Sequence, residues 1–236
     1  MKTEIISGLI GEDHPSVKEV LKIAEEIMSK NKVLNIQNLY NIAKKRLKIP
    51  RTGLLSIIRF LINRKILIEG SKFSKETVLS NHIRNNVLKY IKANPGVHFS
   101  NLRRRALSED IGSSGQLLWH LEMLLKFNYI KKIKVGNYTV FLPAALDKEM
   151  GKILFFIRDR INNKIIFLLV EEDAVKKSEI VKKINEKRED VYYRLNILLR
   201  NELLIETPDK DITINPKRKE LILDILKDLN LFIKKK

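Results

Sequence analysis

One apolar pattern occurs three times along this chain and limits the folds that the chain can adopt. Each copy places apolar residues at positions i, i+3, i+8 and i+9, which is the spacing of a helix that packs on a core and then turns into a strand. Three copies indicate one small structural unit repeated in tandem. The copies are Ile58, Leu61, Ile66 and Leu67; Leu121, Leu124, Tyr129 and Ile130; and Leu195, Leu198, Leu203 and Leu204.

The segments around the three copies follow one order, in which two helices and a turn come before the helix that carries the pattern. The first round predicts helices over 16–28, 36–47 and 51–64, with a turn over 48–50, and a short strand over 66–70 that ends in a turn. The second predicts helices over 75–93, 101–107 and 113–127, a turn over 108–112 and a hairpin over 129–142. The third predicts helical segments over 148–172 with a break near 162–163, helices over 178–184 and 190–201, a hairpin over 203–214 and a last helix over 217–233.

Helix, short helix, turn, helix and β-hairpin is the plan of the winged helix, in which the second and third helices form a helix-turn-helix. We therefore predict a mainly α fold with small β-hairpin wings, arranged as three tandem winged-helix domains. The predicted domains cover residues 1–73, 74–146 and 147–236, and the last includes the C-terminal helix.

The chain is strongly basic, with 46 Lys and Arg against 28 Asp and Glu and a formal net charge of +18. Residues 1–73 carry 14 basic and 7 acidic side chains, residues 74–146 carry 11 and 4, and residues 147–236 carry 21 and 17. The excess therefore lies in the first two predicted domains. Such a surface attracts polyanions, chiefly nucleic acid or anionic lipid. A general excess of lysine in proteins from an AT-rich genome is the alternative explanation.

Several classes of function are excluded or disfavoured. The chain has no cysteine, which excludes disulfides, thiol catalysis and cysteine-based zinc sites. Its four histidines are isolated, and no phosphate-binding loop or nucleophile motif is present, so we expect no enzyme activity, no metal and no cofactor. No signal peptide is visible, and the longest apolar run, 165–170, is too short for a membrane span. We expect a cytoplasmic, nucleoid-associated protein without membrane insertion.

The second round carries sequence motifs beyond periodicity. These are Asn94-Pro95-Gly96-Val97-His98-Phe99, Ser113-Ser114-Gly115-Gln116-Leu117-Leu118-Trp119-His120-Leu121, Tyr129-Ile130-Lys131, Gly136-Asn137-Tyr138 and Phe141-Leu142-Pro143. Residues 75–216 resemble archaeal winged-helix-turn-helix transcriptional regulators, although Trp119 stands where that family usually has Tyr. The third round resembles the second winged helix of two-domain members, while the first is placed by the internal repeat alone. The resemblance implies DNA binding.

In a helix-turn-helix, the third helix enters the major groove and the second lies across the backbone. For the second domain, the candidate residues are Ser113, Ser114, Gln116, Trp119 and His120 on the outward face of the third helix, Arg103, Arg104 and Arg105 on the second helix, Lys131, Lys132 and Lys134 on the wing, and Asn137 at its tip. Gln116 suits bidentate contact with adenine, and the basic side chains suit phosphate. A solvated surface is the alternative. Leu118 and Trp119 are also compatible with a protein interface, and Trp119 with packing under the wing.

The flanking domains differ in charge. The first offers Arg51, Thr52, Ser56 and Arg59 on its third helix for DNA contact, with a basic structural cap as the alternative. The third begins its third helix with Glu189 and Asp190 and has an acidic hairpin tip at 208–211, which suits a phosphate-lined groove badly. We expect this domain and the terminal helix to form a homodimer or to bind a protein partner. The helix packing on its own domain is the alternative.

The leading functional prediction is a transcriptional regulator that binds double-stranded DNA through recognition helices and basic wings. The main alternative is a winged-helix protein–protein scaffold, comparable to ESCRT or RNA polymerase subunits, because the fold alone does not settle function. RNA binding through the same basic surface is less favoured, since no aromatic platform of the single-strand type is visible.

Overall fold

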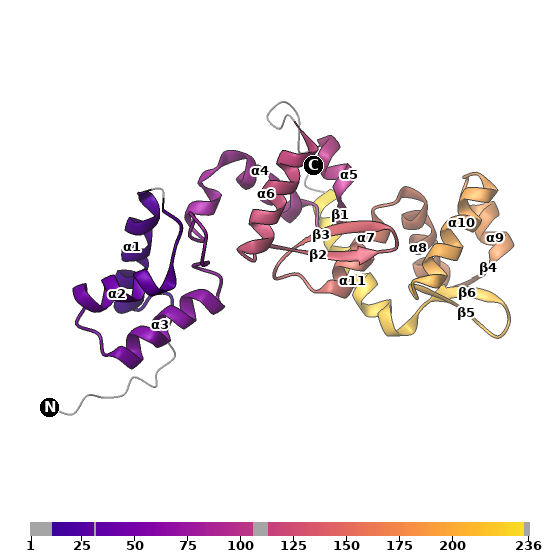
Figure 1. The fold of residues 1–236 in the computed structure, drawn as a ribbon. Helices are drawn as coiled ribbons and strands as arrows, with labels where there is room; N and C mark the ends of the chain where they lie inside the picture. Colours follow the sequence, from indigo (N-terminus) through magenta and orange to yellow (C-terminus); the bar gives the residue numbers. More distant parts are fainter. Residues whose placement is uncertain (1–10, 31, 106–112, 234–236) are drawn as a thin grey trace. The chain divides into compact units, whose positions relative to one another are not determined.

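The computed structural model describes residues 11–30, 32–105 and 113–233 (Figure 1). The fold is mainly helical with two small antiparallel sheets, as the sequence predicts. The chain divides into two compact units. The first contains the described residues up to 89 and those from 113 to 130, and the second contains 90–105 and the described residues from 131 onward.

The first unit begins with three helices, α1 (Pro15–Ser29), α2 (Ile36–Arg46) and α3 (Arg51–Asn63). Asn35 caps α2, because its side chain accepts a hydrogen bond from the Asn38 N–H at 2.8 Å. The three helices enclose an apolar core, in which Leu39, Leu54 and Leu61 are fully buried. α2 and α3 are joined by the short turn predicted from sequence, so this part of the chain has the helix-turn-helix arrangement.

The strand predicted over 66–70 is wrong. Ile66 and Leu67 are buried as expected, but the segment consists of turns. Lys65 and Gly70 both have positive φ angles, of 57° and 73°, and a chain that reverses twice within six residues cannot run as a strand. Leu34 forms two backbone hydrogen bonds of 2.8 Å with the end of this segment, one to Gly70 and one to Ser71.

The first unit also contains the 3₁₀ turn η1 (Thr77–Ser80), the first two turns of α4 (His82–Ala93) and α6 (Ser114–Lys126). The helix predicted over 75–93 is therefore split, because the Asn81 side chain accepts a hydrogen bond from the Arg84 N–H and begins α4 afresh. Ser113 caps α6 in the same way, accepting from the Gln116 N–H at 3.2 Å. The predicted turn over 108–112 lies outside the described residues.

The second unit holds a sheet of three strands in the order β1-β3-β2, formed by β1 (Val97–His98), β2 (Ile130–Val135) and β3 (Tyr138–Pro143). The predicted hairpin is thus present, and Gly136, with a φ angle of 57°, makes its turn. The short helix α5 (Phe99–Arg105) packs against β1 and β3. Along the chain, the order α4, β1, α5, α6, β2, β3 is consistent with a winged helix.

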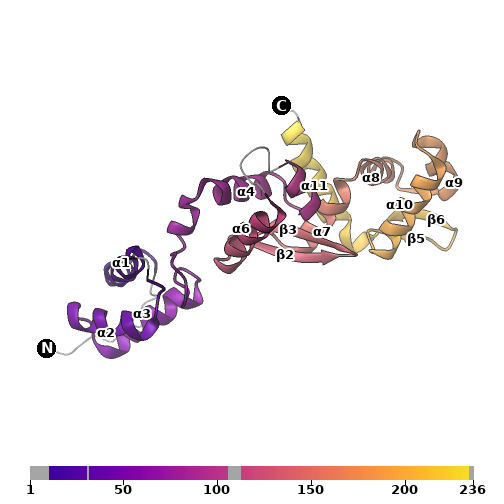
Figure 2. The ribbon, with the colours of Figure 1, turned by 45° about the horizontal axis from the view of Figure 1, so that its top comes forward.

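The same order recurs entirely inside the second unit. It runs through α8 (Arg160–Glu172), β4 (Ala174–Lys176), α9 (Lys177–Lys183), α10 (Arg188–Arg200), β5 (Leu204–Glu206) and β6 (Asp211–Ile214). Its strands are ordered β4-β6-β5, so the last strand lies in the middle as in the first sheet. α10 packs against α8, α9 and β5 (Figure 2). This part of the chain is also consistent with a winged helix.

Two further helices complete the second unit, α7 (Lys148–Ile157) and α11 (Pro216–Ile233). The helical break predicted near 162–163 occurs earlier, because the Asp159 side chain accepts hydrogen bonds from the Ile161 and Asn162 N–H groups and begins α8. α7 packs against β3 and against α11. One apolar core runs from Val135 and Leu142 through α7 to Leu226, so the boundary predicted near 146 falls inside a continuous core. The division into three domains stays a prediction.

Within the described ranges, no helix combines the length and the apolar character that crossing a membrane requires.

Candidate nucleic-acid interface

The recognition-helix candidate α6 presents a mixed polar and apolar face to solvent. Ser113, Gln116 and Trp119 are exposed, as expected, and Ser114 is half-buried. The expected outward position of His120 is wrong, since its side chain is only 5 % exposed. His120 follows Leu117 by three residues, so it falls on the buried stripe that continues with Leu121 and Leu124.

Arg84 of α4 lies between two aromatic rings of the first unit. Its guanidinium carbon is 4.7 Å from the ring centroid of Phe73 and 5.1 Å from that of Trp119. The side chain is 2 % exposed, and its Nε and Nη1 atoms have no hydrogen-bond partner. The two cation–π contacts therefore supply the favourable surroundings that a buried guanidinium needs. Sequence reasoning missed Arg84, because its partners lie 11 and 35 positions away in sequence.

Trp119 and His120 pack edge to face, with ring centroids 4.9 Å apart. Burial lowers the pKa of His120 below its usual value, and electrostatic interactions with Arg84 and then His82 lower this pKa further. His120 is therefore a neutral ring at neutral pH, one that supports α6 from inside.

The second unit carries exposed basic residues on α5 and β2. Arg103 and Arg104 are exposed and line a shallow hollow with Phe99 and Ser100. Arg104 Nη2 donates a hydrogen bond of 2.7 Å to Asn101 Oδ1, which fixes its direction. The side chain of Arg105 lies outside the described residues.

The β2–β3 hairpin shows the alternation expected of a strand with one solvated face. Lys132 and Lys134 are exposed on that face, while Lys131 is half-buried on the other. Backbone N–H groups of Met150 and Glu149 lower the pKa of the Asp147 carboxyl, and the charge of Lys131 adds to this effect. Lys131 is thus partly engaged within the unit. Asn137 is exposed at the tip.

The first helix-turn-helix has a comparable surface. Arg51, Thr52, Ser56 and Arg59 are all exposed on α3, as the sequence predicts. Arg46 of α2 is held by Glu26 at 2.6 Å, whereas no ion pair involves Arg51 or Arg59 within the described residues.

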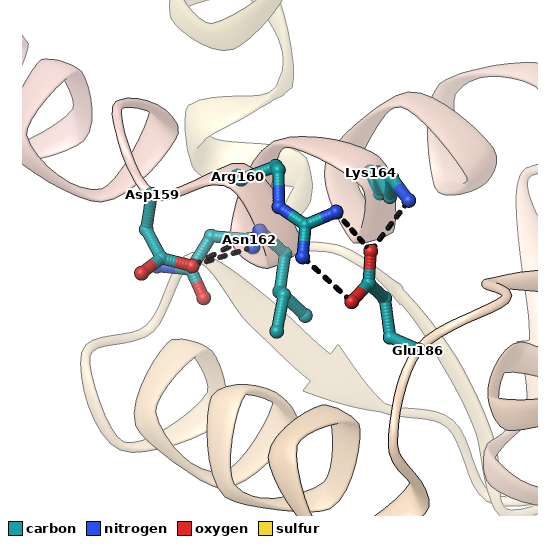
Figure 3. A network of polar contacts seen from close by, with 6 residues as sticks. Asp159, Arg160, Asn162, Lys164 and Glu186 are labelled. Atoms are coloured by element: carbon teal, nitrogen blue, oxygen red, sulfur yellow. Dashed lines mark hydrogen bonds and ion pairs between the residues drawn. The ribbon is translucent and has the colours of Figure 1, made fainter.

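The third round differs, because several of its basic residues form ion pairs with its own carboxylates. Figure 3 shows Arg160 and Lys164 of α8 converging on the carboxylate of Glu186, with Lys164 Nζ at 2.6 Å from Oε1. Hydrogen bonds from Lys164 and then Arg160 lower the pKa of Glu186 below its ordinary value. Asp159 also binds Arg194 of α10 at 2.8 Å. Further pairs join Lys177 to Glu206, Lys183 to Glu172 and Lys219 to Asp173.

The basic residues of α5 and β2 differ from those of the third round in their ion pairing. In the ranges that the structure covers, Arg103, Arg104, Lys132 and Lys134 form no ion pair. Their charge is available to an external anion. No cluster of three or more potential metal-ligating side chains occurs among the described residues.

Comparisons with known proteins agree with this arrangement. Residues 81–152 match the model of a family described as an N-terminal HTH domain. An uncharacterized HTH-type transcriptional regulator of Methanocaldococcus jannaschii is 31 % identical over 147 residues, which are 62 % of this chain and 35 % of that protein. The match thus spans about a third of the relative's length. The predicted resemblance to archaeal helix-turn-helix transcriptional regulators is confirmed, and residues 81–152 are similar to an HTH domain.

Proposed function

We propose that this chain is a DNA-binding transcriptional regulator made of three tandem winged helices, and that its second winged helix is the principal DNA-contacting module. One observation supports the proposal most strongly. Inside the segment that matches the HTH family, 81–152, the exposed side chains of Arg103, Arg104, Lys132 and Lys134 form no ion pair with any described carboxylate. Unpaired basic side chains on a helix-turn-helix favour contact with phosphate.

Within this proposal the candidate residues divide by role. Arg103, Arg104, Arg105, Lys132 and Lys134 bind backbone phosphates, while Ser113, Ser114 and Gln116 of α6 face base edges. Lys131 and Asn137 contribute at the hairpin. Arg51, Thr52, Ser56 and Arg59 extend the contact through the first helix-turn-helix. His120 contacts no DNA and supports α6 instead, because it is buried.

The third winged helix has a different proposed role, as a dimerisation or partner-binding module together with α11. The support is its charge balance, since residues 147–236 carry 21 basic and 17 acidic side chains and several of the basic ones form ion pairs within this part of the chain. Asp209 and Lys210 are exposed at the tip of its hairpin, and Tyr193 is 60 % exposed on α10. Aromatic side chains of this kind are enriched at protein interfaces. A regulator of this design works by binding, at the nucleoid, without catalysing a reaction.

A salt series tests the proposal. The dissociation constant of the full chain for a fluorescently labelled random-sequence duplex is measured by anisotropy between about 50 and 200 mM salt. With roughly six phosphate contacts at about −0.9 each, the log–log slope is expected to be near −5. Changing Lys132 and Lys134 together to Ala should flatten the slope by up to about 2 units.

Lys227→Ala is the matched control, because Lys227 is also an exposed lysine, lies on α11 and pairs with Asp224 at 3.4 Å. It should leave the slope unchanged. A chain that fails to bind duplex at low salt, or whose affinity ignores salt, would instead support the protein–protein scaffold.

A further inference from the structure

Leucine side chains are exposed at equivalent positions of α3 and α6, two of the three helices that carry the repeated apolar pattern. Leu55 and Leu118 lie three residues before the first members of their apolar patterns, Ile58 and Leu121, and are 36 % and 48 % exposed. Trp119 lies next to Leu118 and is also 48 % exposed. Leaving such side chains in water has a free-energy cost, so their recurrence on one helix face points to an apolar contact.

The surroundings of Leu118 and Trp119 on α6 favour a nucleic-acid contact. Gln116 precedes Trp119 by three residues and shares its face, and Gly115 leaves the position one turn before Leu118 without a side chain. A Cβ atom at Gly115 would meet only Ser113 Oγ, at 3.8 Å, so the surface there is open. This helix lies inside the segment that matches the HTH family.

Two neighbouring side chains, Arg84 and His120, contact the Trp119 ring and hold it in place. The guanidinium of Arg84 stacks on its ring at 5.1 Å, Phe73 covers the same guanidinium at 4.7 Å, and His120 packs against the indole edge. A side chain that is half exposed yet fixed by a buried stack loses little conformational entropy when it binds a rigid surface. Arg84 is therefore a positioning residue for Trp119.

We propose that Leu118 and Trp119 form an apolar contact surface for thymine C5-methyl groups in the DNA major groove, with Arg84 holding Trp119 in its binding orientation. The thymine methyl is the apolar group that a major groove presents among hydrogen-bond donors and acceptors. A glutamine beside this surface suits the adenine that pairs with a neighbouring thymine. The inference rests on the proposed DNA-binding function and adds to it a preference for thymine at the contacted steps.

The test uses the full chain and one duplex in two chemical forms. A duplex pool with a random core is enriched for binding by the full chain, and the best-bound sequence is then synthesised with thymine or with deoxyuridine, which lacks only the methyl group. Burying one methyl group corresponds to about a fourfold change in binding. We expect the unmodified chain to bind the thymine form at least about fourfold more tightly. Leu118→Ala should bring the ratio of the two dissociation constants towards one.

Val33→Ala is the matched control, because Val33 is 51 % exposed in the same unit but lies outside the third helices. It should keep the ratio of the unmodified chain. Arg84→Lys retains the charge but not the planar stack, so it should lower both the ratio and the steady-state anisotropy of Trp119 emission.

The possible results distinguish the thymine contact from the proposed DNA-binding function. Salt-dependent binding with equal affinity for both duplexes would overturn the thymine contact and leave the proposed function standing. A thymine preference that survives Leu118→Ala and Trp119→Ala would overturn the assignment to these residues. Absence of duplex binding at low salt would overturn both the proposed function and the inference.

Discussion

At the scale of single residues, α6 depends on two buried groups that carry or can acquire positive charge, Arg84 and His120. Arg84 is stabilised by aromatic faces, whereas His120 remains neutral, because burial and the charge of Arg84 lower its pKa. His82 adds to the same effect. Protonating His120 in the folded state would place a second positive charge beside the guanidinium of Arg84, so this cluster links the stability of the first unit to pH.

The expected result is a loss of stability in acid. Unfolded His120 titrates near its ordinary pKa of about 6.5, and the folded state resists the proton down to a lower pH. The stability that neutral His120 contributes is complete above about pH 6.5 and is lost as the pH falls towards the folded pKa. Thermal unfolding at about pH 7.5 and about pH 5 should show a smaller decrease in melting temperature for His120→Gln than for the unmodified chain.

His98 also has a lowered pKa, through burial and the charge of Arg104, and it is present in both proteins. Its contribution cancels when the two pH dependences are compared. Equal pH dependence in the variant and in the unmodified chain would contradict the assignment to His120.

At the scale of elements, ion pairs join α8 to the turn between α9 and α10 and to α10 itself. Glu186 lies in the turn between α9 and α10, and its carboxylate binds Arg160 and Lys164 of α8 (Figure 3). A further ion pair joins Asp159, at the start of α8, to Arg194 of α10. These pairs fix α10 relative to α8.

Glu186→Gln should lower the melting temperature of the second unit at neutral pH, because it removes the charge that both basic partners share. The pKa of folded Glu186 is lowered, so its contribution is present above the unfolded pKa, about 4.3, and is lost as the pH falls through the folded value. The difference in melting temperature between variant and unmodified chain should therefore shrink in strong acid. A difference that is constant from neutral to acidic pH would show that the ion pairs are not its cause.

Some of these elements could be predicted from the sequence and others could not. The apolar spacing located α3, α6 and α10, and Gly136-Asn137 located the β2–β3 turn, because periodicity and turn chemistry are local. The strand over 66–70 failed, because pairing depends on a partner that the local sequence does not specify. The burial of His120, the Arg84 stack and the Glu186 ion pairs depend on contacts between distant segments, which no local pattern reveals.

At the scale of the whole molecule, charge is distributed unevenly among modules of related design. Arg103 and Arg104 of α5 and Lys132 and Lys134 of β2 form no ion pair among the described residues, whereas several basic residues of the third round do. Within the second unit, α7 packs against β3 and shares one apolar core with the elements of the third round. Arg158 Nε donates to the Pro95 oxygen at 2.9 Å, and Gly96, with a φ angle of 86°, lets α7 approach so closely that a Cβ atom would lie 2.9 Å from the Phe155 nitrogen.

This continuity has a consequence for regulation within the proposed function. Leu142 of β3, Ile153 of α7 and Leu195 of α10 belong to one packed core, which would connect the proposed partner-binding module to β3. A coupling of this kind needs no flexible linker between the proposed partner-binding and DNA-binding modules.

The central claim is that α6 of the second winged helix meets duplex DNA, and Trp119 allows this to be measured directly. Trp119 is the single tryptophan of the chain, so all tryptophan emission reports on the exposed face of α6. The full chain is titrated with random-sequence duplex at about 50 mM salt while Trp119 emission and the anisotropy of labelled DNA are both recorded. We predict that both signals saturate together, and that raising salt to about 200 mM weakens binding by about a thousandfold. Saturating anisotropy with no change in Trp119 emission, or no binding at low salt, would contradict the claim.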